Sequence, residues 1–213
     1  MSEKLAQRNY YGKALAELAA ENPRVVVLDA DLAGSTKTSD FKKVCPERFV
    51  EVGIAEQNMI GIAAGLAASG KIAFASTFGV FATGRCWEQI RLAVAYPRLN
   101  VKIVATHCGI SVGEDGASHQ ALEDMAVMRA LPNMTVIAPS DSAQCIKAIR
   151  ATLEYPGPVC FRIARGAEPA VYTTQDYDYE VGKAITALDG TDLTIIATGS
   201  LVALSISAAN GLA

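Results

Sequence analysis

The chain has 213 residues, of which 51% are hydrophobic and 19% are charged, and its formal net charge is −3. A chain of this length and composition can bury one substantial core, so we expect one domain, or one domain and part of a second. The basic residues are scattered along the sequence, which argues against a nucleic-acid-binding stripe and a polybasic membrane patch. Small molecules and other proteins are therefore the expected partners.

The cysteines are odd in number and none belongs to a CxxC motif, which argues against a disulfide framework and a zinc site. The sequence begins MSEKLAQRNYYGKAL, without the regions of a signal peptide, and no apolar run approaches the length of a membrane span. We expect a cytoplasmic protein with reduced, mostly buried thiols. These are Cys45, Cys86, Cys108, Cys145 and Cys160.

Short β-branched runs alternate with helical patterns along the first 166 residues. Such alternation is typical of βαβ units with a parallel sheet covered on both faces. We predict an α/β fold with a mostly parallel, doubly wound sheet of six strands. The expected strands are 24–29, 49–52, 72–76, 101–106, 134–138 and 159–163, and the expected helices are 2–20 (capped by Ser2), 55–69, one ending near 96, 120–130 and 140–155.

The character of the sequence changes after Gly166. Residues 167–180 are acidic, aromatic and rich in turn formers, as linkers are, and residues 181–213 resemble a new strand and helix. One strand and one helix are too small for an independent core. We therefore predict a first domain at 1–166, a linker at 167–180 and the incomplete start of a C-terminal domain at 181–213.

The segment EVGIAEQNMIGIAAG, residues 51–65, is a strand end that turns into a helix of small and apolar residues. At its centre is one acid, Glu56, with no basic residue near it in sequence. Glu56 is either a first-turn residue favoured by the helix dipole or a working carboxylate, and the residues alone favour the first interpretation.

Both histidines of the chain, His107 and His119, lie in one loop, HCGISVGEDGASH, with Glu114 and Asp115 between them. This concentration of titratable groups favours a functional loop over polar residues that merely satisfy one another. The spacing does not match a set of metal ligands.

Three further features have structural and functional interpretations. Arg162 and Arg165 end a strand, where they can hold a phosphate or form surface ion pairs. Phe78 and Phe81 either belong to the core or line a cleft and stack on an aromatic ring. The loop at 30–36 follows a strand, where α/β sheets bind ligands. No GxGxxG, GxxxxGK[ST], GxSxG or HExxH motif occurs.

The segments EVGIAEQNMIGIAAGLA, STFGVF, THCGISVGEDGASHQ and FRIARG together resemble the pyrimidine-binding domain of thiamine-diphosphate enzymes, and specifically of transketolases. The resemblance covers the chain to about Gly166 and continues more weakly beyond it. It implies that Glu56 hydrogen-bonds N1′ of the aminopyrimidine and so favours the imino tautomer, which takes the proton from C2 of the thiazolium. It also implies that Phe78 and Phe81 pack on the pyrimidine, while Gly84 stands where the family often has a tyrosine.

The same resemblance assigns the substrate site. It implies that His107 and His119 contact the sugar hydroxyls and carbonyl and move protons, and that Asp115 reads the stereochemistry of the donor's C2 hydroxyl. The residues that it places around the sugar phosphate are Arg8, Ser35, His107 and Arg165.

The GDG…N pattern that holds the diphosphate and Mg²⁺ in this family is absent from the sequence. The resemblance therefore implies the C-terminal section of a split transketolase of pentose phosphate metabolism, working with an N-terminal subunit in a dimer of heterodimers. Close packing at Gly61 and Gly65 would suit the subunit interface. The alternatives are a 1-deoxy-xylulose-5-phosphate synthase, a 2-oxo acid dehydrogenase β subunit, both disfavoured by His107, and a catalytically idle partner.

Overall fold

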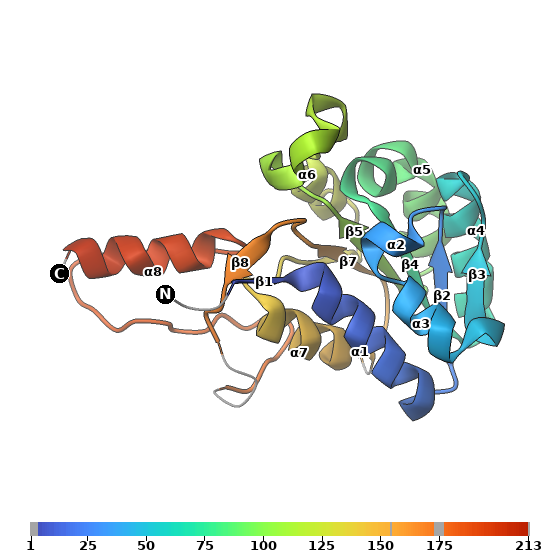
Figure 1. The fold of residues 1–213 in the computed structure, drawn as a ribbon, viewed down its shortest axis with the longest axis horizontal. Coiled ribbons are helices and arrows are strands. Elements are labelled where there is room, and N and C mark those ends of the chain that lie inside the picture. The colour runs from blue at the N-terminus through green and yellow to red at the C-terminus, as the bar shows by residue number, and fades with distance from the viewer. Residues whose placement is uncertain (1–3, 154, 173–176, 213) are drawn as a thin grey trace.

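A six-stranded sheet forms the centre of the protein in the computed structural model, which describes residues 4–153, 155–172 and 177–212 (Figure 1). All neighbouring strands in this sheet are parallel. The prediction of a mostly parallel α/β sheet of six strands is therefore confirmed. Across the sheet, the strands are β3 (Phe49–Glu51), β2 (Val25–Asp29), β4 (Ile72–Phe78), β5 (Val101–Thr106), β7 (Val159–Arg162) and β6 (Thr135–Ile137).

Three of the four interior strands are buried from end to end. Every residue of β2, β4 and β5 is buried, which explains why their sequences are nearly continuous apolar runs. The carboxyl ends of β4 and β5 lie side by side, with Phe78 opposite Thr106 in the register. This edge of the sheet therefore carries the loops that follow both strands.

Helices cover both faces of the sheet, so the fold is doubly wound (Figure 1). One core contains buried residues of α1 (Gln7–Glu21), α3 (Ser39–Val44) and α7 (Ser142–Leu153). The other contains residues of α4 (Glu56–Ala68), α6 (Asp124–Arg129) and the helical stretch Phe81–Ala95. That stretch comprises π-helical Phe81–Arg85, α5 (Trp87–Gln89) and π-helical Ile90–Ala95. The shorter elements are α2 (Ala33–Thr36) and the 3₁₀ turns Pro46–Arg48, Ile110–Asp115 and Ala117–His119.

The start of the chain differs from the prediction. The first helix begins at Gln7, whereas the predicted cap Ser2 lies outside the described residues. Lys4–Ala6 instead form β1, which pairs antiparallel with β8 (Ala167–Pro169) in the predicted linker. The Gln7 side-chain nitrogen Nε2 donates to the Pro139 carbonyl at 2.9 Å. Tertiary pairing thus overrides the local helical pattern.

The helix predicted at 120–130 is shorter than expected, since α6 begins at Asp124. Gly109 donates its backbone N–H to the Ala121 carbonyl at 3.0 Å. This bond holds the preceding segment against the histidine loop. The segment is therefore used to position the loop and does not extend the helix.

The C-terminal part shows the predicted helix without the predicted strand. The helix α8 (Leu201–Leu212) has no buried residue and projects away from the sheet (Figure 1). Residues 181–200 form no strand, and Gly199 donates its N–H to the Ala138 carbonyl at 3.2 Å. A strand needs a hydrogen-bonded neighbour, and the described residues supply none here. The domain boundaries stay a prediction.

All five cysteines are buried and unpaired, as expected. Among the described residues, no helix is both long and apolar enough to span a membrane.

Candidate active site

The predicted site residues gather at the carboxyl edge of β4 and β5 and at the start of α4. Phe78 ends β4, His107 follows β5, and Glu56 is the first residue of α4. The Phe78 ring lies 3.9 Å from the His107 ring and 6.3 Å from the His119 ring, centroid to centroid. Residues that are far apart in the chain therefore meet in one cluster.

Glu56 is buried, with 3% of its side chain exposed. Its position in the first turn of α4 places the carboxylate at the positive end of the helix dipole. The carboxylate oxygen Oε1 accepts a hydrogen bond from Arg85 Nη1 at 2.6 Å. Glu56 thus has a basic partner in space although it has none nearby in sequence, and this partner was not predicted.

Arg85 also lies over an aromatic ring. Its Cζ is 4.6 Å from the centroid of Phe81, within the range of a cation–π contact. Phe81 and Arg85 are the two ends of a π-helical turn, a conformation that is frequent at functional sites. The turn brings the aromatic ring and the guanidinium to the same side as Glu56.

Phe78 and Phe81 form an aromatic wall. Their rings are nearly parallel, with an interplanar angle of 9° and centroids 6.0 Å apart. His119 packs edge-on against Phe81 at 5.4 Å, and the Ser118 hydroxyl lies 2.9 Å from His119 Nδ1. A Cβ on Gly84 would meet no atom within 4 Å, so one side of this wall is open.

His107 is held in one tautomer by its two neighbours. Arg8 Nη1 lies 3.2 Å from Nε2, and the Thr106 hydroxyl lies 2.9 Å from Nδ1. Because a guanidinium only donates hydrogen bonds, Nε2 must accept and Nδ1 carries the proton. Burial, followed by the charges of Arg8 and Arg165, lowers the His107 pKa to about 4, against a smaller opposing effect of Asp115. The imidazole is therefore neutral at physiological pH.

The predicted phosphate ligands are only partly brought together. Arg8 Nη1 donates to the Ser35 carbonyl at 3.1 Å, so the main chain of Ser35 makes this contact. Arg165 Nη2 pairs with the exposed Glu114 at 3.2 Å. Burial and then the charge of Arg165 lower the Arg8 pKa, while Asp115 stays exposed. The guanidinium groups of Arg8 and Arg165 thus both lower the pKa of the His107 imidazole.

A buried acid shapes the loop that contains Ser35. Asp29 ends β2 and accepts hydrogen bonds from the hydroxyls of Thr36 and Thr38 at 2.7 and 2.8 Å and from the Leu32 N–H at 2.7 Å. Burial outweighs these bonds and raises the Asp29 pKa to about 6. The predicted ligand loop is therefore a compact turn built on one carboxyl group.

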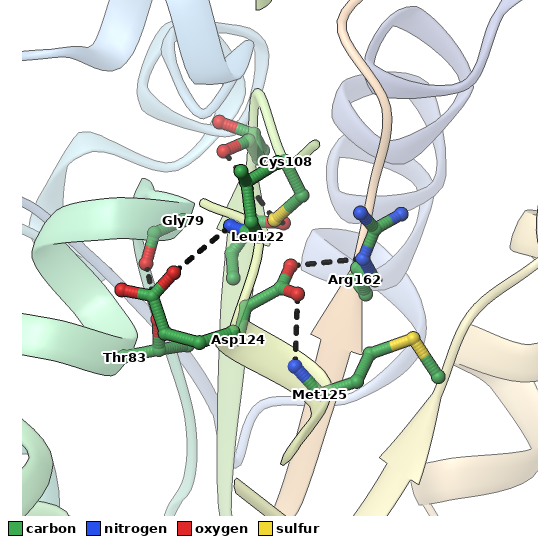
Figure 2. Close-up of polar contacts among 10 residues, drawn as sticks. Gly79, Thr83, Cys108, Leu122, Asp124, Met125 and Arg162 are labelled. Atoms are coloured by element: carbon green, nitrogen blue, oxygen red, sulfur yellow. Dashed lines mark hydrogen bonds and ion pairs between the residues drawn. The ribbon is translucent and has the colours of Figure 1, made fainter. Parts of the chain in front are cut away.

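Besides the Arg85–Glu56 pair, an ion pair between Arg162 and Asp124 packs against the histidine loop. Figure 2 shows Asp124, which accepts from Arg162 Nε at 2.8 Å and from the Met125 N–H at 2.8 Å. A Cβ on Gly109 would lie 2.8 Å from Arg162 Nη2, so the loop rests directly on this guanidinium. Arg162 therefore forms an ion pair, but with a buried carboxylate and not at the surface as expected. Burial raises the pKa of the neighbouring Cys108 thiol, which keeps it protonated.

Sequence reasoning missed three contributors, Arg85, Thr106 and Asp124. Arg85 and Asp124 act through contacts to residues 29 and 38 positions away in sequence, so no local motif marks them, whereas Thr106 lies inside the histidine motif and acts through its hydroxyl. The described residues contain no group of three or more His, Cys, Asp or Glu side chains able to hold a metal ion.

The family model for the pyrimidine-binding domain of transketolase matches residues 3–169. The chain belongs to the transketolase family. Its fold matches that of a split-gene transketolase, described as an inactive β4 tetramer, with a TM-score of 0.90 and 52% identity. The alignment covers 99% of this chain and 68% of that one.

Some relatives are named as a section or a subunit of a transketolase. A protein of Methanocaldococcus jannaschii, provisionally named a transketolase C-terminal section, is 58% identical over 92% of this chain and 62% of its own length. One subunit of an apulose-4-phosphate transketolase from Phocaeicola vulgatus is 43% identical over 93% of this chain and 64% of its own length. The chain thus spans somewhat less than two thirds of these relatives.

Proposed function

We propose that this chain is the pyrimidine-binding subunit of a thiamine-diphosphate-dependent transketolase. With a partner subunit it transfers a two-carbon ketol unit from a ketose phosphate to an aldose phosphate. The observation that carries the proposal is the buried carboxylate of Glu56 at the first turn of α4, beside the Phe78–Phe81 wall and both histidines. Membership of the transketolase family supports it.

The residues present fit an aminopyrimidine ring. A planar heterocycle needs an aromatic surface to pack on and a polar partner for its edge. The rings of Phe78 and Phe81 supply the surface, Glu56 supplies a carboxylate, and the empty space beside Gly84 leaves room for entry. When bound, thiamine diphosphate supplies the nucleophilic carbon that makes and breaks the carbon–carbon bond.

Glu56 holds a proton at ring atom N1′ in this proposal. A buried carboxylate forms a strong hydrogen bond with a protonated ring nitrogen, because no bulk water competes for the proton. The remainder of α4 keeps the carboxylate in place, since Met59 and Ile60 are fully packed in the core. The role of Glu56 is thus general acid–base catalysis on the cofactor.

The histidines and arginines act on the sugar. Arg8 turns toward the phosphate of the substrate in this proposal. The lone pair on Nε2 of the neutral His107 is then free to accept a hydrogen bond from a sugar hydroxyl. His119 presents its second nitrogen beside the aromatic wall, and Asp115 stands exposed next to it in the loop. Arg8 and Arg165 supply the positive charge that an anionic group attracts.

The partner subunit supplies the diphosphate and Mg²⁺ ligands in the proposal. Relatives named as a C-terminal section and as one subunit of a transketolase support a split enzyme. We propose a dimer of heterodimers, with the exposed Gly61 and Gly65 of α4 at the subunit interface.

Reconstitution tests the proposal. The chain is mixed with an N-terminal subunit, thiamine diphosphate, Mg²⁺ and a ketose phosphate, and transfer to an aldose phosphate is followed. Glu56→Gln should lower kcat by about 10²–10⁴-fold, as for the loss of an acid–base group. The matched control Glu88→Gln changes an exposed acid of α5 and should leave kcat unchanged. Equal activity of Glu56→Gln and wild type would remove the assigned role, and substantial turnover by the chain alone would exclude a split enzyme.

A further inference from the structure

One guanidinium already contacts two of the three side chains that the proposed function assigns to the cofactor ring. Arg85 Nη1 lies 2.6 Å from Glu56 Oε1, and Arg85 Cζ lies 4.6 Å from the centroid of Phe81. A guanidinium is planar, donates hydrogen bonds from its edge and stacks on aromatic rings. An aminopyrimidine offers the same combination of a flat face and a polar edge. Arg85 therefore contacts the carboxylate and one of the two aromatic rings of the pocket from within the chain.

The two side chains of this ion pair differ in how exposed they are and in how far they can move. The Arg85 side chain is 46% exposed, whereas Glu56 is 3% exposed and fixed to the first turn of α4. Gly84, which precedes Arg85, is exposed and faces open space. The Arg85 main chain is held separately, because Gln57 donates to its carbonyl at 3.1 Å. The guanidinium can therefore swing into solvent without moving the backbone, while the carboxylate stays.

The unpaired alternative is unfavourable for Glu56. A buried carboxylate that loses its only ionic partner retains the cost of desolvation without the compensating attraction. Among the described residues, Arg85 is the only side chain that forms an ion pair with Glu56. The pair thus stabilises the pocket whenever no other group neutralises the carboxylate.

We propose that Arg85 is an internal placeholder that occupies the pyrimidine pocket of the cofactor-free chain and is displaced when thiamine diphosphate binds. This inference rests on the proposed function. It makes Arg85 a determinant of cofactor affinity, because binding is weakened by the fraction of molecules whose pocket is filled by the guanidinium.

Calorimetric titration of thiamine diphosphate tests the placeholder. It uses the complex with the N-terminal subunit and Mg²⁺, and it compares wild type, Arg85→Met and Arg85→Lys. Methionine keeps an apolar stem but cannot pair with Glu56. The control, Arg24→Met, changes an exposed arginine next to the amino end of β2, at the opposite edge of the sheet.

The placeholder predicts tighter binding without the guanidinium. Arg85→Met should lower the Kd of the cofactor by about three- to tenfold, the range expected for displacement of a half-exposed ion pair. Arg85→Lys should fall between this value and wild type, since an ammonium pairs with a carboxylate but lacks the planar fork. Arg24→Met should match wild type. Without cofactor, the Arg85→Met chain should melt at a lower temperature than wild type, because Glu56 is left unpaired.

Unchanged or weaker cofactor binding by Arg85→Met would overturn the inference, and weaker binding would show that Arg85 holds the ring. Should Arg85→Met fail to fold, a wild-type Kd for Arg85→Lys would overturn it. Failure of the wild-type complex to bind the cofactor would sink the proposed function and this inference together. Normal wild-type binding with unaffected Arg85 variants would sink this inference alone.

Discussion

Removal of the buried imidazole of His107 should change how stability depends on pH. The folded-state pKa is about 4, against an ordinary value of 6.5, so the unfolded chain binds a proton at His107 more readily. Stability from this group is present above pH 6.5 and is lost as pH falls toward 4. Between pH 7 and pH 5, His107 should therefore lower the free energy of unfolding by about 2 kcal/mol.

The suitable substitution is His107→Asn. Position 107 has a φ of 59°, and asparagine is one of the few residues that adopt this left-handed conformation readily. The variant loses the ring contact with Phe78 at every pH, so its absolute stability is lower. The quantity of interest is the difference in unfolding free energy between wild type and variant, measured by urea denaturation at several pH values.

This difference should shrink by about 2 kcal/mol from pH 7 to pH 5. Other titrating groups, including Asp29, are common to both proteins and cancel in the comparison. A difference that is the same at pH 5 and pH 7 would refute the reasoning, because it would mean that His107 binds protons equally well in the folded and unfolded chains.

Two further predictions concern the end of β2 and the helix α1. Asp29→Asn should show the opposite pH dependence. The folded pKa of Asp29 is about 6 and exceeds the ordinary 3.8, so the unfolding free energy of wild type relative to the variant, measured in urea, should grow by about 1 kcal/mol from pH 7 to pH 5. A difference that does not change with pH would contradict the burial argument. Gly12→Ala should destabilise the chain by about 1–3 kcal/mol, because the added Cβ would lie 2.6 Å from the Lys37 carbonyl oxygen. In the matched control Gly61→Ala, also in a helix, the added Cβ meets no atom within 4 Å. Equal thermal stability of the two variants would contradict the steric explanation.

The sheet could be predicted because its information is local. Runs such as Val25–Leu28 and Ile103–Ala105 are apolar throughout, and burial on both faces of the sheet accounts for them. The β1–β8 pair could not be predicted in this way. Its two strands of three residues are separated by most of the chain, so neither carries a periodicity long enough to detect.

The candidate site residues that lie together in the structure are those that fall inside a motif. Glu56, Phe78, Phe81 and the two histidines fall in segments that resemble the family, and the structure brings them together. Arg85 was missed because its significance depends on a contact across 29 positions. Ser35 shows the converse limit, since its main chain rather than its hydroxyl makes the contact with Arg8.

The β1–β8 pair also gives the site a mechanical connection. Ala6 is at once the last residue of β1 and the cap of α1, and Arg8 is the second residue of that helix. The β8 strand continues directly into the segment that leads toward α8. Three residue pairs between β1 and β8 therefore connect that segment to the start of the helix that carries Arg8. The position of the guanidinium that contacts His107 therefore depends on the pairing of β1 with β8.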